Sequence, residues 1–287
     1  MSDGNKKPVI IGLGEIVWDM LPGGKQLGGA PVNFAYFAMR LGAESYPMSA
    51  VGNDRLGDET LERCCEYGIN TAYIRRNGLP TSRVLVTVNV SGVPQYEIVE
   101  GVAWDGFSAS EKDFALATKA DCICWGSLAQ RNAEASRNIL AVVDATGKDC
   151  LKVFDINIRQ HYYSLEVVEA SLERADVLKL NEDELPLVLN LTGLGSVADI
   201  IAEYSLRYLV LTCGAAFSEV YDRAGLVSHL DTPRVKVADT VGAGDSFTAT
   251  FVALLLQGLP VAHCHAKAIE ISAKVCTFSG AINDFEI

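Results

Sequence analysis

The residues with the clearest chemical potential lie in one segment, residues 239–247, which reads Asp-Thr-Val-Gly-Ala-Gly-Asp-Ser-Phe. Strand-like residues 234–238 precede two glycines around an alanine, and an apolar run without a helix breaker follows over residues 247–256. This order predicts a strand, a tight turn and a helix whose first turn contains Asp245. Such a helix N-terminus presents unpaired N–H groups and a partial positive charge, and small residues let a phosphate approach them.

Asp245 would lie beside this phosphate site, but its negative charge would repel a phosphate, so it is not suited to bind one. A carboxylate in that position can instead accept the proton of a hydroxyl that attacks the phosphorus. The segment therefore indicates phosphoryl transfer to an alcohol, with Asp245 as the base. Backbone N–H groups would form an anion hole for the transferred phosphoryl group at Gly242, Ala243 and Gly244. The alternative is an ordinary glycine-rich turn before a helix.

A second polar group, Asp155-x-Asn157-x-Arg159, follows the predicted strand at residues 151–154. If the strand continues, alternation places the three side chains on one face. A guanidinium binds phosphate through two parallel hydrogen bonds, so we expect Arg159 to contact the transferred phosphate. A solvated loop arginine is the alternative.

Other polar residues also have two interpretations. Asp19 and Asn33 offer the acceptors and donors that a polyol needs, although Asn33 equally suits a helix start and Asp19 a surface turn. Asn181 and Glu184 have the spacing of a capping box at a helix N-terminus.

Residues 239–247 resemble the C-terminal signature of the ribokinase-like sugar kinases, the phosphofructokinase-B family. Residues 28–35, Gly-Gly-Ala-Pro-Val-Asn-Phe-Ala, resemble the N-terminal signature of the same family. Further motifs follow in the family's order at residues 41–42, 51–54, 56–57, 155–159, 181–184 and 212–214. The resemblance covers about residues 9–280 and is greatest for fructokinases, because of Gly-Gly-Ala-Pro-Val-Asn and Asp-Ile-Asn-Ile-Arg.

The resemblance implies a carbohydrate kinase that passes the γ-phosphoryl group of ATP to a primary hydroxyl of a monosaccharide, with fructose giving fructose 6-phosphate. It assigns the sugar contacts to Asp19, Gly28, Gly29, Asn33 and Asn157.

The resemblance also implies sites for the nucleotide and for ions. It assigns the nucleotide site to Asn181, Glu184, Thr212 and Gly214. Glu184 would hold Mg²⁺ largely through water, since magnesium keeps several waters and needs few carboxylates. In part of the family K⁺ binds at the positions of Asp239 and the carbonyl of Val241, although many members carry threonine in place of Val241.

Two alternatives to fructose phosphorylation stay open. The same chemistry would serve ribose, a ketodeoxygluconate or a nucleoside. Tyr36, Phe37, Tyr96 and Trp104 could supply aromatic walls for a nucleoside, but packing in the core or the lid explains them equally well. A catalytically silent sugar sensor on the same fold is the other alternative, against which Asp245 and the intact glycine turn argue.

Short apolar runs alternate with helical patterns along the chain. This predicts an α/β fold with a doubly wound, mostly parallel sheet flanked by helices, in a single domain over residues 1–287. The expected strands are residues 9–13, 46–51, 122–125, 151–154, 177–180 and 208–211. The expected helices are residues 31–41, 56–67, 111–118, 134–145, 164–174, 197–205, 243–257 and 261–278. Each of Asp155, Asn181, Thr212 and Asp239 follows a predicted strand, so we expect them at one edge, where such sheets bind ligands.

Two segments interrupt the alternation. Residues 17–27 are glycine-rich, and residues 83–104 predict a hairpin with strands at 84–89 and 95–99 around a Ser91-Gly92 turn. In the resembling family such segments form a small β-strand lid over the sugar that often mediates dimerisation. The resemblance therefore implies lid segments at about residues 15–28 and 82–105 and a homodimer.

Composition limits the partners. A net charge of −12 and a pI near 4.8 argue against nucleic acid, and an anionic nucleotide would need a locally positive pocket. No apolar segment approaches the roughly 18 residues of a membrane helix, and the polar residues 1–8 do not form a signal peptide. The eight cysteines contain no Cys-x-x-Cys pair, which favours structural thiols over zinc or disulfides and predicts a cytoplasmic protein.

Overall fold

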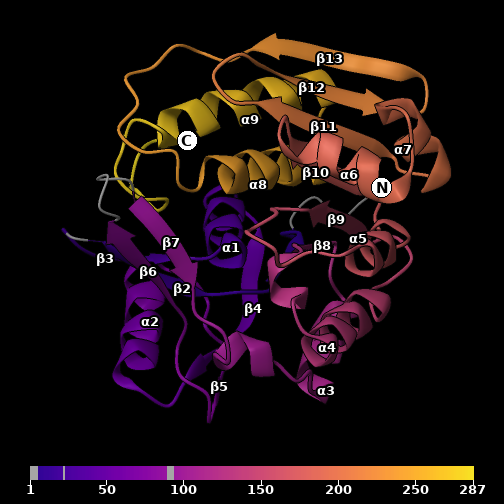
Figure 1. Cartoon of the computed structure of the whole chain (residues 1–287). Coiled ribbons are helices and arrows are strands. Elements are labelled where there is room, and N and C mark those ends of the chain that lie inside the picture. The colour runs from indigo at the N-terminus through magenta and orange to yellow at the C-terminus, as the bar shows by residue number, and fades with distance from the viewer. Residues whose placement is uncertain (1–5, 22, 89–93) are drawn as a thin grey trace.

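The computed structural model describes residues 6–21, 23–88 and 94–287. A nine-stranded sheet runs through it in the order β13-β12-β11-β10-β9-β8-β1-β4-β5, with helices on both faces (Figure 1). The strands from β11 to β5 pair in parallel, and β12 and β13 extend one edge as antiparallel strands. Their bounds are β1 (Val9–Leu13), β4 (Glu44–Gly52), β5 (Ile74–Asn77), β8 (Cys122–Trp125), β9 (Leu151–Asp155), β10 (Val177–Asn181), β11 (Tyr208–Cys213), β12 (Phe217–Asp222) and β13 (Gly225–Asp231).

Alternate residues of the parallel strands face opposite sides of the sheet, and each side has its own apolar core. Ile10 and Val177 belong to the core on one side, and Ile11 and Leu178 belong to the core on the other. The first core is covered by α1 (Ala30–Arg40), α2 (Arg55–Glu66), α8 (Ala243–Leu256) and α9 (Val261–Val275). The second is covered by α3 (Glu111–Ala117), α4 (Ala133–Asp144), α5 (Leu165–Leu172), α6 (Glu184–Thr192) and α7 (Val197–Glu203). The predicted doubly wound α/β fold is confirmed.

Every helix and strand of the predicted alternation is present, with small shifts at the ends; the last helix stops at Val275 instead of residue 278. In the main sheet and its helices, three strands and one α-helix were not predicted: β5, β12, β13 and α6. Pro186 obscured the helical pattern of α6, but it lies in the first turn, where its missing N–H is harmless. β5 and β13 are the two edge strands of the main sheet, β12 lies next to β13, and all three carry mixed polar and apolar residues.

The predicted strand at residues 234–238 is wrong. These residues are exposed and run outside the sheet. The N–H of Ala238 donates to the carbonyl of Cys276 at the end of α9, at 2.8 Å, instead of to a neighbouring strand. Because this tertiary contact directs the segment, the glycine turn is reached from a loop, and Asp239 does not follow a strand.

A second sheet has the order β3-β2-β6-β7 and lies beside the main one (Figure 1). It consists of β2 (Val17–Leu21), β3 (Gly24–Gly28), β6 (Arg83–Val88) and β7 (Pro94–Ile98). The predicted hairpin is confirmed, since β6 and β7 pair antiparallel, while its Ser91-Gly92 turn lies outside the described residues. In β2, the indole N–H of Trp18 donates to Thr60 Oγ1 of α2 at 2.9 Å, which fastens the sheet to the core.

Within the described residues no single helix is long and apolar enough to cross a membrane, and only the bent pair α6 and α7 reaches that length and composition together. All eight cysteines are free thiols.

Candidate active site

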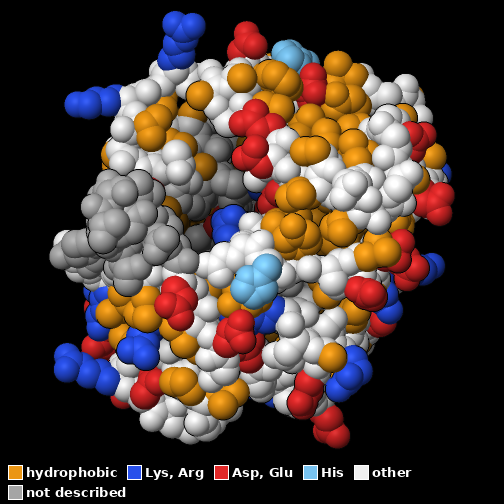
Figure 2. All heavy atoms as spheres, viewed as in Figure 1, with side chains coloured by type: hydrophobic (Ala, Val, Ile, Leu, Met, Phe, Trp, Pro, Cys, Tyr) orange, Lys and Arg blue, Asp and Glu red, His pale blue; other side chains and the backbone are white. Residues whose placement is uncertain are grey.

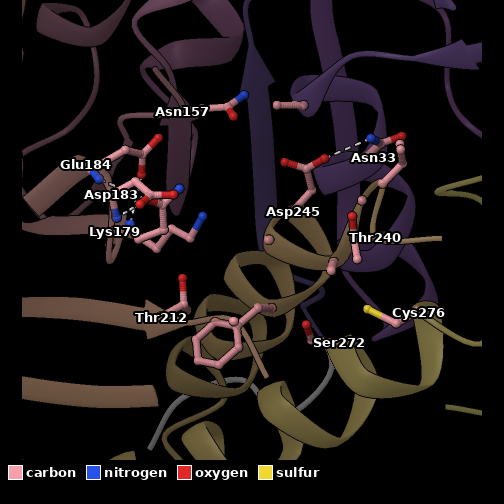
Figure 3. Close-up of a pocket in the computed structure, with 18 of the residues that line it drawn as sticks. Asn33, Asn157, Lys179, Asp183, Glu184, Thr212, Thr240, Asp245, Ser272 and Cys276 are labelled. Carbon is pink, nitrogen blue, oxygen red and sulfur yellow. Dashed lines mark hydrogen bonds between the residues drawn. The ribbon is translucent and has the colours of Figure 1, made fainter. Parts of the chain in front are cut away.

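A cleft of about 1010 Å³ lies between the small sheet and the carboxyl ends of the main strands. Figure 2 shows it as a hollow in one face of the molecule, and Figure 3 shows part of its lining. Of the residues predicted for catalysis or binding, Asp239 alone is not part of the lining. The lining includes Asp19, Gly28, Gly29, Asn33, Asn157, Arg159, Asn181, Glu184, Thr212, Gly214, Val241, Gly242, Ala243, Gly244 and Asp245.

The glycine turn forms the N-terminus of α8. Gly242 caps the helix with φ 79°, and a Cβ at this position would lie 2.4 Å from the Cβ of Ala281. The left-handed backbone and this close contact both require glycine. The N–H of Ala243 donates to the carbonyl of Thr240 at 3.3 Å, a long bond that a bound anion could replace. The turn thus has the backbone and the partial charge of an anion site.

Asp245 lies in the first turn of α8, partly exposed where it lines the cleft, and faces α1 (Figure 3). Its Oδ2 accepts a hydrogen bond from Nδ2 of Asn33 at 2.8 Å. Asn33 itself is buried, and its Oδ1 has no partner among the described side chains and backbone. A buried oxygen beside the cleft without a partner is suited to a ligand hydroxyl.

Asn33 is positioned by an unusual helix start. Gly29 caps α1 with φ 114°, and a Cβ there would lie 2.5 Å from the carbonyl oxygen of Glu15. Pro31 follows in the first turn, where proline is favoured. The glycine therefore lets the start of α1 approach the loop after β1, which brings Asn33 to Asp245.

Carboxyl groups in the cleft hold their protons more tightly than usual. Burial, followed by the charge of Asp155, raises the pKa of Asp245 to about 6. Burial raises the pKa of Asp19 and raises that of Glu15 to about 7. A carboxylate with a pKa near 6 is ionised at neutral pH and is a stronger base than an exposed aspartate, as a general base requires. Glu15 was not predicted as a site residue.

The strand does not continue from Asp155 to Arg159, so the condition for placing Asp155, Asn157 and Arg159 on one face is not met. β9 ends at Asp155, and Asn157 has φ 45°. The chain leaves the sheet there, and the N–H of Ile158 donates to Oε1 of Glu184 at 2.8 Å. Asn157 and Arg159 consequently line the cleft, while Asp155 is buried and makes no part of that lining.

Asn181 and Glu184 make both contacts of a capping box. Oδ1 of Asn181 accepts from the N–H of Glu184 at 2.9 Å, and Oε2 of Glu184 accepts from the N–H of Asn181 at 2.8 Å. Asn181 and Glu184 also line the cleft. Thr212 is the register partner of Asn181 on β11, and Gly214 follows with φ 48°.

Asp239 organises the loop before α8. Its Oδ1 accepts from the N–H groups of Thr240 at 2.7 Å and Val241 at 3.1 Å, and its Oδ2 accepts from the N–H of Gly280 at 3.0 Å. The carboxylate therefore ties this loop to the segment after α9.

Lys179 of β10 is a cleft residue that the sequence reasoning missed. It is 8 % exposed, and its Nζ lies 3.1 Å from Oδ1 of Asp155. The available signal was a single lysine in the strand Val-Leu-Lys-Leu-Asn, because a charge in a buried strand is rare unless it is paired.

These features define a class of protein: an α/β fold with a cleft in which a carboxylate and an amide lie beside an anion-binding helix N-terminus. The chain belongs to the pfkB family of carbohydrate kinases, whose family model matches residues 20–287. It is 31% identical to the fructokinase of Escherichia coli over 272 residues, which cover 86% of this chain and 83% of that protein. The protein is a sugar kinase, as the resemblance implied.

Solved structures share the fold. The fructokinase with bound ATP from Xylella fastidiosa has a TM-score of 0.83 at 23% identity, covering 96% of this chain and 94% of that chain. The fructokinase from Vibrio cholerae O395 in its fructose, ADP and calcium ion bound form has a TM-score of 0.79 at 22% identity, covering 96% and 94%.

Proposed function

We propose that this kinase transfers the γ-phosphoryl group of ATP to the primary 6-hydroxyl of fructose, forming ADP and fructose 6-phosphate. The position of Asp245 carries the proposal, because its carboxylate lies in the cleft at the helix N-terminus and is held by Asn33. The 31% identity with a fructokinase supports fructose as the acceptor.

In the proposed reaction, Asp245 accepts the proton of the attacking hydroxyl as its oxygen bonds to the γ-phosphorus and the bond to ADP breaks. In a loose transition state the proton leaves late, so positioning contributes more than base strength. The N–H groups of Gly242, Ala243 and Gly244 donate hydrogen bonds to the transferred phosphoryl group and stabilise its negative charge. The guanidinium of Arg159, in the loop after β9, neutralises part of the same charge. The sugar hydroxyls are bound by Asp19, Gly28, Gly29, Asn33 and Asn157.

The nucleotide phosphates occupy the side of the cleft formed by Asn181, Thr212 and Gly214. Among the described residues no group of three or more His, Cys, Asp or Glu side chains is arranged to hold a metal ion. That suits Mg²⁺, which would take most of its ligands from water and phosphate and contact Glu184 through water. When bound, Mg²⁺ neutralises charge on the phosphates.

Three further features belong to the proposal. Potassium would bind beside Asp239 and the carbonyl of Val241, at the loop that holds the anion site. The small sheet would act as a lid and also form the interface of a homodimer. Sedimentation velocity would detect the dimer. A reaction that consumes ATP is suited to a cytoplasmic enzyme.

The test measures ADP release from Mg²⁺-ATP with a panel of sugars, with and without K⁺, in the wild type and in Asp245→Asn. We expect turnover on fructose, stimulation by K⁺, and a loss of about 10²-fold to 10⁴-fold in kcat in the variant with sugar binding retained. Turnover on ribose or a ketodeoxygluconate alone would replace the acceptor, and near-normal turnover in the variant would remove Asp245 as the base. Sugar binding without turnover on any sugar would indicate a sensor.

A further inference from the structure

A buried ion pair lies directly beneath the proposed anion hole. Lys179 on β10 and Asp155 on β9 are register partners in neighbouring strands, and their side chains are 10% and 7% exposed. The Nζ of Lys179 lies 3.1 Å from Oδ1 of Asp155. A buried charge pair that sits at the carboxyl edge of the sheet, beside a ligand cleft, contributes little to stability compared with an apolar pair. Its position therefore points to a role in the site.

The pair is connected to the first turns of α8. Oδ2 of Asp155 accepts a hydrogen bond from Oγ1 of Thr248 at 2.8 Å, and the same hydroxyl lies 3.0 Å from the carbonyl oxygen of Gly244. Two strands and the helix that carries Asp245 are thereby joined through one carboxylate.

Lys179 also meets α8 directly. A Cβ on Gly244 would lie 2.9 Å from the Nζ of Lys179, and in Figure 3 the ammonium group extends from β10 toward the start of this helix. Gly244 has an ordinary helical backbone, unlike Gly242 with its positive φ. The absence of a side chain at Gly244 therefore makes room for the ammonium as well as for a phosphate.

We propose that Lys179 is a positioning residue, which acts through Asp155, Thr248 and Gly244 to hold the first turn of α8 and the carboxylate of Asp245 in place for phosphoryl transfer. The inference rests on the proposed role of Asp245 as the base. Lys179 does not remove a proton itself; it supplies the positive charge behind the helix N-terminus.

The charges around Asp245 explain why this cation matters. The groups that act on it come from several elements: Glu15 after β1, Asn33 of α1, Cys124 of β8, Asp155 of β9, Arg159 after β9 and Lys179 of β10. Asp155 favours a protonated Asp245, whereas Lys179 and Arg159 favour the carboxylate. The pKa of Lys179 is raised although burial acts to lower it, because Asp155 and Glu184 stabilise its charge. Lys179 thus stays charged wherever Asp245 titrates.

The test compares the pH dependence of kcat/KM for fructose in the wild type, Lys179→Met and Lys179→Arg. Loss of the positive charge of Lys179 should raise the midpoint of the acidic limb of the kcat/KM profile by on the order of one pH unit. This is the lower end of the effect that a nearby opposite charge has on the pKa of a carboxyl group. The loss of activity in Lys179→Met should therefore be greater near pH 6 than near pH 9, and Lys179→Arg should restore the limb. An unchanged limb in Lys179→Met would overturn the proposal.

Two more variants separate charge from position. Thr248→Val removes the bond to Asp155 and keeps every charge, so kcat should fall while the acidic limb stays in place. Lys152→Met removes a lysine of β9 that lies outside the cleft lining, and neither kcat nor the limb should change. A shift of the limb in Lys152→Met equal to that in Lys179→Met would show a general charge effect and overturn the assignment.

A readout without turnover covers failure of the proposed function. In protein labelled at the aspartate carboxyl carbons, the Asp245 resonance is identified by its loss in Asp245→Asn, and its titration is followed by NMR. We expect the pKa of Asp245 to rise in Lys179→Met. An unchanged titration would overturn the inference about Lys179, even if the wild type phosphorylates fructose and the proposed function therefore stands. If the wild type phosphorylates no sugar, the proposed function fails, and the carboxyl titration still decides whether Lys179 holds Asp245 ionised.

Discussion

At the scale of single residues, the site depends on charges and amides removed from water. Asn33 donates to Asp245, and its buried Oδ1 has no hydrogen-bond partner among the described residues. Burial, followed by the charge of the nearby Asp155, raises the pKa of Asp245 to about 6. Such a carboxylate is a better base than an exposed one, but an ionised group in this place opposes folding.

The raised pKa gives a prediction for stability with a defined sign. Folding shifts the pKa of Asp245 from 3.8 to about 6, so the folded state binds the proton more tightly than the unfolded state. This contribution to stability is complete below pH 3.8 and is lost as the pH rises through about 6. Asp245→Asn should therefore melt at a higher temperature than the wild type near pH 8, and the advantage should shrink toward about pH 4.

Melting curves of both proteins over this range measure the effect. The control is Asp231→Asn, because the side chain of Asp231 is 94% exposed and lies outside the cleft lining. A difference between Asp245→Asn and the wild type that is the same at every pH would contradict the prediction.

At the scale of elements, helix starts bring the site together. Gly29 and Gly242 cap α1 and α8 with positive φ, and each faces a neighbour too close for a side chain. Both positions require glycine for two reasons: the left-handed backbone conformation and the close contact with a neighbouring atom. A helix end with only one of these constraints provides a matched comparison.

Gly242 and Gly258 flank α8 and have nearly the same φ, 79° and 81°. Gly242→Ala would clash with Ala281, whereas a Cβ at Gly258 meets no atom within 4 Å. Both substitutions incur the left-handed penalty of about 1–2 kcal/mol, and Gly242→Ala should lose about 1–3 kcal/mol more from the overlap. Urea unfolding gives the free energies, and kcat should fall in Gly242→Ala only. Equal losses of stability with full activity in both variants would show that the turn tolerates a side chain.

At the scale of the whole molecule, the cleft lies between two sheets that are covered to different extents. The main sheet has an apolar core on each face, while the four-stranded sheet adds Val17, Val84 and Ile98 to one of these cores. Trp18 bonds to Thr60, and Arg131, paired with Asp105, donates to the carbonyl of Val99 at 2.8 Å just beyond β7. The proposed lid role requires the small sheet to respond to the sugar in spite of these contacts.

Hydrogen exchange tests this response. If the small sheet closes over the acceptor, fructose alone should slow amide exchange in β2, β3, β6 and β7, and ATP alone should slow it at residues 212–214 and 242–244. The edge strand β13 should not respond to fructose, which makes it the internal control. Unchanged exchange throughout the small sheet with saturating fructose would contradict its role as a lid.

Much of the fold could be predicted because local patterns and burial agree. Among the central strands, β1 and β8 are continuous apolar runs and β10 is an apolar run interrupted by Lys179, and α8 follows its glycine turn without a breaker. Edge strands such as β5 and β13 were missed because they are half-exposed and carry no continuous apolar run. Residues 234–238 were assigned wrongly because a strand-like pattern is local, whereas their partner, Cys276, lies beyond α9.

By itself, the sequence determined the order of the central strands and their helices, the glycine turn and most of the polar residues that line the cleft, because periodicity and backbone requirements are encoded locally. Only the tertiary structure decided which charges meet. It brought Asn33 to Asp245, turned the chain at Asn157 so that Asp155 left the cleft, and paired Asp155 with Lys179 beneath α8. The energy of a charge depends on burial and on partners distant in sequence, and neither can be read from the neighbours along the chain.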